Sequence, residues 1–82
     1  MLKVLFFASL REALGQDQLR LDSHRATTVA ELREAMLADH PEWKDSLTQP
    51  KLMVAVNQSM GRDETPLKDG DEVAFFPPVT GG

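Results

Sequence analysis

A single long amphipathic helix is the feature of this sequence that most constrains its fold. Thr28 and Glu31 have the spacing of a capping box, which predicts that the helix begins there. Pro41 disfavours helical geometry in the residue before it, so the helix should end near position 40. Between these limits, three apolar residues recur at helical spacing: Val29, Leu32 and Met36. Because one such helix buries a single apolar stripe, we expect a sheet as the second layer.

Four segments with the composition of β-strands flank this helix, two before it and two after it. They are residues 3–8, 18–22, 51–57 and 71–76. A short helix should separate the first two strands, with Ser9 as its N-cap and Gly15 as its stop, and so short a connection predicts antiparallel pairing. This order of elements predicts an α+β domain in which a sheet of four or five strands packs against the main helix.

The first and last strands carry apolar residues on both faces. Six residues of the sheet are expected to face the helix: Val4, Phe6, Val54, Val56, Val73 and Phe75. If the first and last strands are neighbours, Phe7 and Phe76 lie on the opposite face in an apolar patch, which is typical of a partner surface. Met60, in a segment with turn character, could extend the patch. Two alternatives stay open: another part of the chain covers the patch, or Met60 is an ordinary loop residue.

The last six residues, 77–82, form a distinctive tail. The two prolines that open it cannot donate hydrogen bonds to a strand ladder, so we expect a domain over residues 1–76 and an extended, flexible tail after it. A tail of this length reaches about 20 Å when extended. Gly81 and Gly82 have no side chains, and a terminal carboxylate would therefore sit on a thread narrow enough to enter a tunnel. The alternative is a frayed chain end without a role.

A terminal carboxylate is chemically inert until it is activated, most simply by transfer of AMP from ATP. The sequence has no Gly-rich loop that would bind the phosphates of ATP, so this chemistry must belong to another protein. The tail therefore predicts a carrier whose terminal carboxyl group is modified by one enzyme and used by another.

Composition excludes several other kinds of function. The chain has 82 residues and no Cys, which excludes a disulfide scaffold, a thiolate zinc site, an iron–sulfur cluster and a cysteine nucleophile. A formal net charge of −4 argues against non-specific binding to nucleic acid. The sequence has no apolar run long enough for a membrane span and no features of a signal peptide, so we expect no membrane partner and a cytoplasmic location.

The acidic and histidine side chains give no expectation of a metal site. Asp69, Asp71 and Glu72 lack the spacing of a calcium loop, and we interpret them as a solvated turn. His24 and His40 lack metal-ligand spacing, and they are interpreted as surface or helix-end residues.

Four segments of the sequence resemble one known family. Residues 4–8, 11–12, 55–58 and 67–82 are similar to the MoaD family, the small subunits of molybdopterin synthase, and the last segment looks like that family's C-terminal signature. The resemblance extends over the whole chain. It implies a ubiquitin-like β-grasp fold, with a mixed sheet of four or five strands packed on one main helix and a flexible Gly-Gly tail.

The resemblance also implies a mechanism. An E1-like enzyme uses ATP to adenylate Gly82, and sulfur from a cysteine desulfurase relay replaces AMP to leave a C-terminal thiocarboxylate. The large subunit of molybdopterin synthase takes in Val79, Thr80 and Gly81 as a thread, and the sulfur passes to cyclic pyranopterin monophosphate. The synthase would be a heterotetramer with two copies of each subunit. This chain would bind no permanent cofactor, and the catalytic residues would lie on the large subunit.

Three residues match positions that the family uses as hydrophobic interface anchors: Phe7, Met60 and Phe76. Other functions stay open at this point. The chain could be the sulfur carrier of the thiamine thiazole pathway, although residues 75–80 resemble the thiamine carriers less well. It could also be a protein modifier that forms isopeptide bonds with lysines, or a passive β-grasp binding module.

Overall fold

One mixed sheet of five strands forms the centre of the molecule, in the order β2-β1-β5-β3-β4. The strands are β1 (Leu2–Phe6), β2 (Gln18–Leu21), β3 (Met53–Val56), β4 (Ser59–Met60) and β5 (Glu72–Phe76). β1 and β5 run parallel, whereas the other neighbours pair antiparallel, including β1 with β2 as the sequence predicted. The computed structural model describes residues 1–78.

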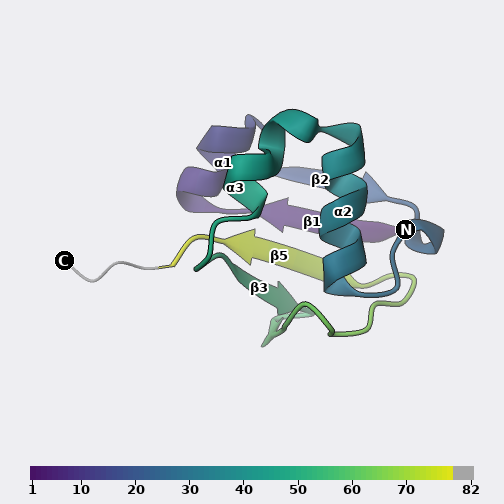
Figure 1. Ribbon diagram of the computed structural model, residues 1–82. Coiled ribbons are helices and arrows are strands. Elements are labelled where there is room, and N and C mark those ends of the chain that lie inside the picture. Colours follow the sequence, from purple (N-terminus) through teal and green to yellow (C-terminus); the bar gives the residue numbers. More distant parts are fainter. Residues whose placement is uncertain (79–82) are drawn as a thin grey trace.

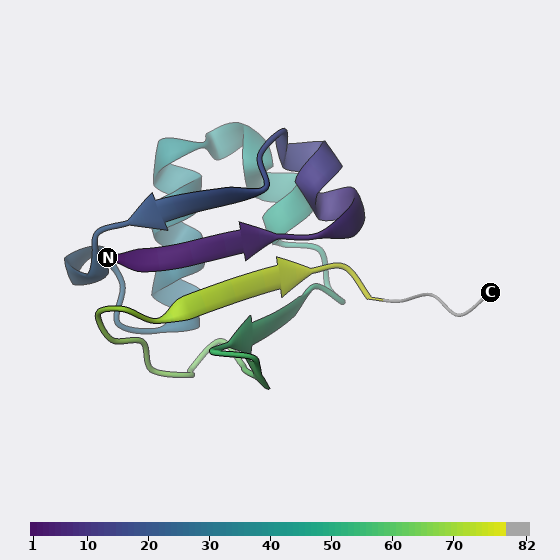
Figure 2. The same ribbon diagram turned by 180° about the vertical axis from the view of Figure 1, so that it is seen from behind.

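Helices cover one face of this sheet. The main helix, α2 (Val29–Asp39), is preceded by α1 (Ala8–Leu14) and followed by α3 (Lys44–Leu47), with short 3₁₀ turns at Ser23–Arg25 and Pro41–Trp43. In Figure 1, α2 and α3 lie in front of the strands. Figure 2 shows the molecule from behind, where no helix of the described residues lies in front of the sheet. The predicted two-layer α+β architecture is confirmed, and it leaves one sheet face open.

The apolar stripe of α2 packs against the sheet as the sequence predicted. Val29, Leu32 and Met36 are each no more than 1% exposed. Five of the six residues expected on the covered face of the sheet are buried: Val4, Phe6, Val54, Val73 and Phe75. The sixth, Val56, is partly buried against the same core. The ring of Phe6 meets the ring of Trp43 edge to face, with centroids 5.7 Å apart, which joins the turn after α2 to the sheet.

The capping box at the start of α2 forms in a modified way. Thr28 Oγ1 accepts a hydrogen bond from the Glu31 amide at 3.2 Å, as expected for an N-cap. The Glu31 carboxylate reaches one residue further back than in the standard motif and accepts hydrogen bonds from the Thr27 amide and hydroxyl, at 2.8 and 2.7 Å. These two hydrogen bonds lower the pKa of Glu31 and tie down the segment that enters the helix.

Ser9 is not the N-cap of α1, and that prediction is wrong. The helix begins two residues earlier than predicted, at Ala8, and Phe7 is its N-cap without a side-chain hydrogen bond. The Phe7 carbonyl oxygen instead accepts hydrogen bonds from the Leu10 and Arg11 amides, at 3.2 and 3.4 Å. The backbone at the end of β1 therefore starts the helix directly. The predicted stop is confirmed, since Gly15 is the C-cap with a φ of 73°.

A short hairpin that the sequence marked only as a turn adds the fifth strand. Asn57 and Gln58 have φ values of 50° and 70°, which is the geometry of a two-residue hairpin turn. The turn pairs Val56 with Ser59 and Ala55 with Met60. β4 is therefore real but only two residues long, too short to give a strand pattern in the sequence.

Asp71 does not belong to a solvated turn, and that interpretation is wrong for this residue. Its side chain is buried, with the residue only 5% exposed. One carboxylate oxygen accepts from Asn57 Nδ2 at 3.0 Å, and the other accepts from the Lys68 amide at 2.9 Å. Hydrogen bonds first from Asn57 and then from Lys68 hold the pKa of Asp71 below its usual value of 3.8.

Candidate functional site

Apolar side chains gather on the open face of the sheet. Alternation along β1, β3 and β5 places the side chains of these strands on the side opposite the helices, because their neighbours in sequence are buried residues of the core. Met60 of β4 lies on the same side because it pairs with Ala55. We call this set the open-face patch; it comprises Leu5, Phe7, Met53, Ala55, Met60, Ala74 and Phe76. The register makes the patch continuous, since Leu5 and Ala55 both lie beside Ala74, on opposite sides of β5. The neighbouring strands β1 and β5 thus form an apolar surface, as predicted from the sequence.

Phe7 and Phe76 lie at the same end of this patch. The Phe7 amide donates to the Phe75 carbonyl oxygen at 3.2 Å, so the parallel pairing of β1 and β5 extends one residue beyond β1. Phe7 is 46% exposed, while Phe76 is partly buried and lies opposite Met53. An exposed phenylalanine fixed on a rigid backbone is a suitable anchor for a partner, because little side-chain entropy is lost on binding.

Met60 lies at the other side of the patch, on the edge strand β4. It is 62% exposed and pairs with Ala55. A methionine on an edge strand offers a flexible apolar side chain that adapts to the shape of a partner. The structure thus brings together the three residues proposed as interface anchors, from three different strands or strand ends.

The root of the tail, by which we mean Pro77 and Pro78, adjoins the same patch. β5 ends at Phe76, and Pro77 and Pro78 follow, partly buried and without regular secondary structure. The end of β5 lies at the side of the sheet away from the N-terminus, as both views show (Figures 1 and 2). The four residues predicted to thread into partners and carry the chemistry, Val79, Thr80, Gly81 and Gly82, lie outside the described residues.

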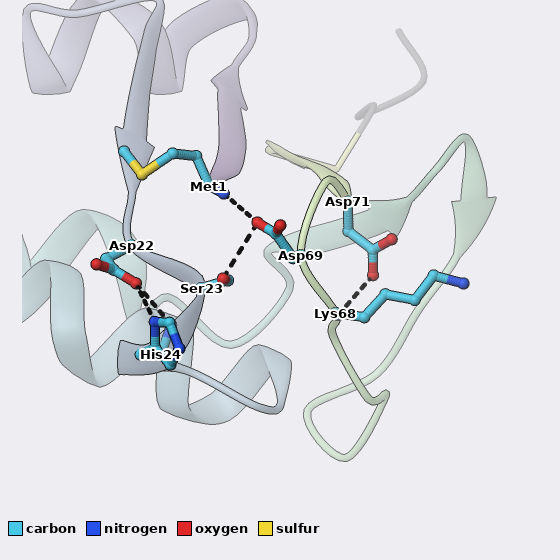
Figure 3. A network of polar contacts seen from close by, with 7 residues as sticks. All are labelled: Met1, Asp22, Ser23, His24, Lys68, Asp69 and Asp71. Atoms are coloured by element: carbon cyan, nitrogen blue, oxygen red, sulfur yellow. Dashed lines mark hydrogen bonds and ion pairs between the residues drawn. The ribbon is translucent and has the colours of Figure 1, made fainter.

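Polar contacts at the opposite end of the sheet serve the scaffold. Figure 3 shows the Met1 ammonium group and the Ser23 hydroxyl both contacting the carboxylate of Asp69, the latter at 3.2 Å. The ammonium contact, followed by the hydroxyl, lowers the pKa of Asp69. Nearby, Asp22 accepts from the His24 amide at 2.9 Å and contacts the His24 ring at 2.8 Å. The contacts of Asp69 tie the start of β1 and the turn after β2 to the loop that precedes β5, and the Asp22–His24 contacts hold the turn itself.

A pocket of about 400 Å³ lies on the helical side of the molecule, bordered by α2, the end of α3 and the loop after β4. Arg33 lines it, donates to Asp63 at 2.7 Å, and holds its guanidinium 5.8 Å from the centre of the Phe75 ring. Because this arginine is paired with a carboxylate and stacked on a core residue, we interpret the pocket as part of the scaffold. Residues 1–78 hold no group of three or more potential metal ligands.

None of the helices in the described part of the chain is long and apolar enough to span a membrane.

Comparison with known proteins decides the family. The sequence profile of the ThiS family matches residues 4–82. The chain belongs to the ThiS family. It is also 50% identical to the molybdopterin synthase sulfur carrier subunit of Escherichia coli over 82 residues, covering all of both chains. The predicted resemblance to MoaD is therefore confirmed.

Similar solved structures identify the fold. The crystal structure of SAMP1 from Haloferax volcanii has a TM-score of 0.81 and 29% identity, covering 99% of this chain and 98% of that one. A complex of subunits 1 and 2 of the molybdopterin-converting factor from Helicobacter pylori contains a chain with a TM-score of 0.68 and 29% identity, covering 99% and 97%. The predicted ubiquitin-like β-grasp fold is confirmed.

Proposed function

We propose that this chain is the sulfur carrier subunit of molybdopterin synthase and that Gly82 carries the sulfur. The observation that supports this most strongly is the full-length identity of 50% with a molybdopterin synthase sulfur carrier subunit. The structure adds a physical reason, because an apolar patch on the open sheet face ends where the chain leaves β5 toward Gly82.

The chemistry proceeds in two stages: the Gly82 carboxylate is first converted to a thiocarboxylate, and its sulfur is then donated to the pterin. An E1-like enzyme transfers AMP from ATP to the Gly82 carboxylate and releases pyrophosphate, which converts an inert anion into an electrophilic acyl adenylate. The terminal sulfur of a cysteine persulfide, supplied by a cysteine desulfurase relay, attacks the acyl carbon and displaces AMP to give an acyl disulfide. A thiol reductant then cleaves the S–S bond, which releases the relay cysteine and leaves a C-terminal thiocarboxylate. Its sulfur is a soft nucleophile and attacks a carbon of cyclic pyranopterin monophosphate, so that a C–S bond forms as a C–O bond to that carbon breaks. Water then hydrolyses the resulting thioester, which leaves the sulfur on the pterin and returns the Gly82 carboxylate. Two such transfers supply both sulfurs of the dithiolene.

The described residues supply binding and orientation in this scheme. The open-face patch docks on the large subunit, with Phe7, Met60 and Phe76 as its anchors. Val79, Thr80 and Gly81 form the thread that carries Gly82 into the partner's site. A complex of this kind is a heterotetramer with two copies of each subunit, and the acids and bases of the reaction belong to the large subunit. We place the process in the cytoplasm, where reduced sulfur persists.

The intact mass of the protein, purified from cells that contain the activating enzyme and sulfur donor, tests this proposal. We expect a species in which one oxygen is replaced by sulfur. A variant lacking Gly81 and Gly82 should show no such species and should keep its fold, because the core lies within residues 2–75. The modified protein should then form molybdopterin when it is mixed with the large subunit and the pterin precursor.

Other results of this experiment would favour other functions. A thiocarboxylate that supports thiazole formation and not molybdopterin formation would indicate a carrier of the thiamine pathway. An unmodified terminus, or one joined to lysines of other proteins, would overturn the proposal in favour of a passive binding module or a protein modifier.

A further inference from the structure

We infer that Asn57 and Asp71 are positioning residues that hold the β3–β4 hairpin so that Met60 is presented on the open-face patch to the partner protein. This inference rests on the proposed function, because it concerns how the chain binds the large subunit. It assigns a role to a polar pair that lies outside the patch itself, made of the buried Asp71 and the exposed Asn57.

Asn57 is fixed to the start of β5 by three hydrogen bonds. Its backbone amide donates to the Glu72 carbonyl oxygen at 2.7 Å, and its side-chain oxygen accepts from the Glu72 amide at 3.0 Å. Its side-chain nitrogen donates to Asp71 at 3.0 Å. The side-chain oxygen thus accepts from β5 as a backbone carbonyl would, and with the backbone amide of Asn57 it extends the β3–β5 pairing beyond the end of β3.

Asp71 anchors Asn57 from inside the fold. Its carboxylate is buried, and its second oxygen accepts from the Lys68 amide at 2.9 Å. A buried carboxylate needs such partners, because an unpaired charge in an apolar setting is costly. The Asn57 amide is therefore held by a group that cannot turn toward water without losing its own hydrogen bonds.

This anchoring determines the turn. Asn57 and Gln58 both have left-handed backbone conformations, and asparagine adopts such a conformation more readily than most residues. The resulting two-residue turn sets the pairing of Ala55 with Met60. A shift of one residue in this pairing would move the Met60 side chain to the other face of the sheet. The direction in which Met60 points thus depends on the geometry at Asn57.

Met60 contributes little to holding its own strand. It is 62% exposed, and β4 has only two residues. After the turn, the chain is held by the Gly61 amide, which donates to the Val54 carbonyl oxygen at 2.9 Å. Gly61 also packs closely, since a Cβ there would lie 3.2 Å from a methyl group of Val56. The hairpin is therefore fixed at its turn and at Gly61, the residue after Met60, which leaves the methionine side chain free to contact a partner.

The test compares Asn57→Gly with Gln58→Gly. Glycine retains the left-handed turn at either position and adds the same backbone freedom, but only Asn57→Gly removes the side-chain hydrogen bonds. We expect Asn57→Gly to weaken binding to the large subunit about tenfold, measured by calorimetry, and Gln58→Gly to change it less than about twofold. Equal effects of the two variants would overturn the inference.

A double-mutant cycle with Met60→Ala shows whether Asn57 acts through Met60. In that background, Asn57→Gly should change affinity by less than about twofold, because the positioned side chain is already gone. An undiminished effect in the Met60→Ala background would overturn the inference and leave the proposed function intact. If the unchanged chain fails to bind the large subunit, the proposed function itself is wrong.

A measurement on the free chain tests the geometry separately. The NMR cross-peak between the Met60 and Ala55 methyl groups should be present in the unchanged chain and in Gln58→Gly, and weakened in Asn57→Gly. Its full retention in Asn57→Gly would show that the pair does not position Met60, whatever the function of the chain.

Discussion

Met53 and Phe76 lie opposite each other in the antiparallel pairing of β3 and β5, on the open face of the sheet. Phe76 is also the last residue of β5. The open-face patch therefore extends to the point where the chain leaves the sheet. A protein that docks on this patch would therefore lie directly beside the root of the tail.

Replacing Phe76 with Asp should weaken binding to the large subunit by about 30-fold or more, because a carboxylate would be buried without a partner in an apolar contact. The far-ultraviolet circular dichroism of the free chain should stay unchanged, since Phe76 lies outside the buried core. Glu34→Gln, an exposed change on α2, serves as the control and should leave affinity unaltered. Unchanged affinity of Phe76→Asp by calorimetry would remove this residue from the interface.

Replacing Asp71 with Asn should make the stability of the domain less dependent on acid pH. Hydrogen bonds from Asn57 and Lys68 lower the pKa of Asp71 in the folded state. Its contribution to the free energy of unfolding is therefore fully present above the unfolded pKa and is lost as pH falls through the lower, folded value. At neutral pH, Asp71→Asn should cost about 1–3 kcal/mol, because one hydrogen-bond donor faces another.

Urea unfolding from about pH 7 down to about pH 3 measures this effect. The fluorescence of Trp43, the single tryptophan of the chain and a buried residue, reports unfolding. Asp45→Asn, at an exposed position on α3, is the matched control and should keep the acid dependence of the unchanged chain. The same acid dependence in Asp71→Asn as in the unchanged chain would contradict the assignment.

Replacing Arg33 with Met should change the free energy of unfolding by less than about 1 kcal/mol. The ion pair of Arg33 with Asp63 involves a carboxylate whose side chain is 62% exposed, so solvent weakens it. The buried Nε of Arg33 has no hydrogen-bond partner among the described residues, and methionine removes that unpaired donor while it retains contact with the Phe75 ring. A decrease of several kcal/mol in the free energy of unfolding, measured by heat or urea, would show that the Arg33–Asp63 ion pair stabilises the fold more than the exposure of Asp63 indicates.

Replacing Gly15 with Ala should lower stability by about 1 kcal/mol, because alanine is strained at a φ of 73°. The loss comes from the backbone alone, since a Cβ at this position would have no atom within 4 Å. Gly15→Asn should cost less, because asparagine tolerates the left-handed conformation. Thermal unfolding of the two variants measures the difference, and equal losses would contradict this cause.

Local patterns predicted the elements but not their exact ends. The stripe of α2 and the stop of α1 at Gly15 depend on spacing within a few residues, and both are confirmed. The expected cap at Ser9 is wrong because the backbone of β1 leads directly into the helix and Phe7 takes the capping position. The sequence shows a Ser followed three residues later by a Glu, but it does not show the direction from which the chain enters the helix.

The polar residues show more clearly that local sequence patterns do not reveal contacts between distant parts of the chain. Asp71 follows a glycine and precedes Glu72, which locally resembles a solvated turn. It can be buried because Asn57, in the turn after β3, donates a hydrogen bond to it. A hydrogen bond between residues this far apart in sequence leaves no periodic pattern, so only the fold could show that the two act together.

The sequence by itself determined the two-layer fold and the apolar faces of its end strands, because alternation and helical spacing are properties of short segments. Only the tertiary structure decided that β1 and β5 are parallel neighbours, that β3 lies on the other side of β5 and that a short hairpin brings Met60 to the same face. Sheet order and register depend on contacts between distant segments, and these contacts turn separate apolar residues into one surface beside the root of the tail.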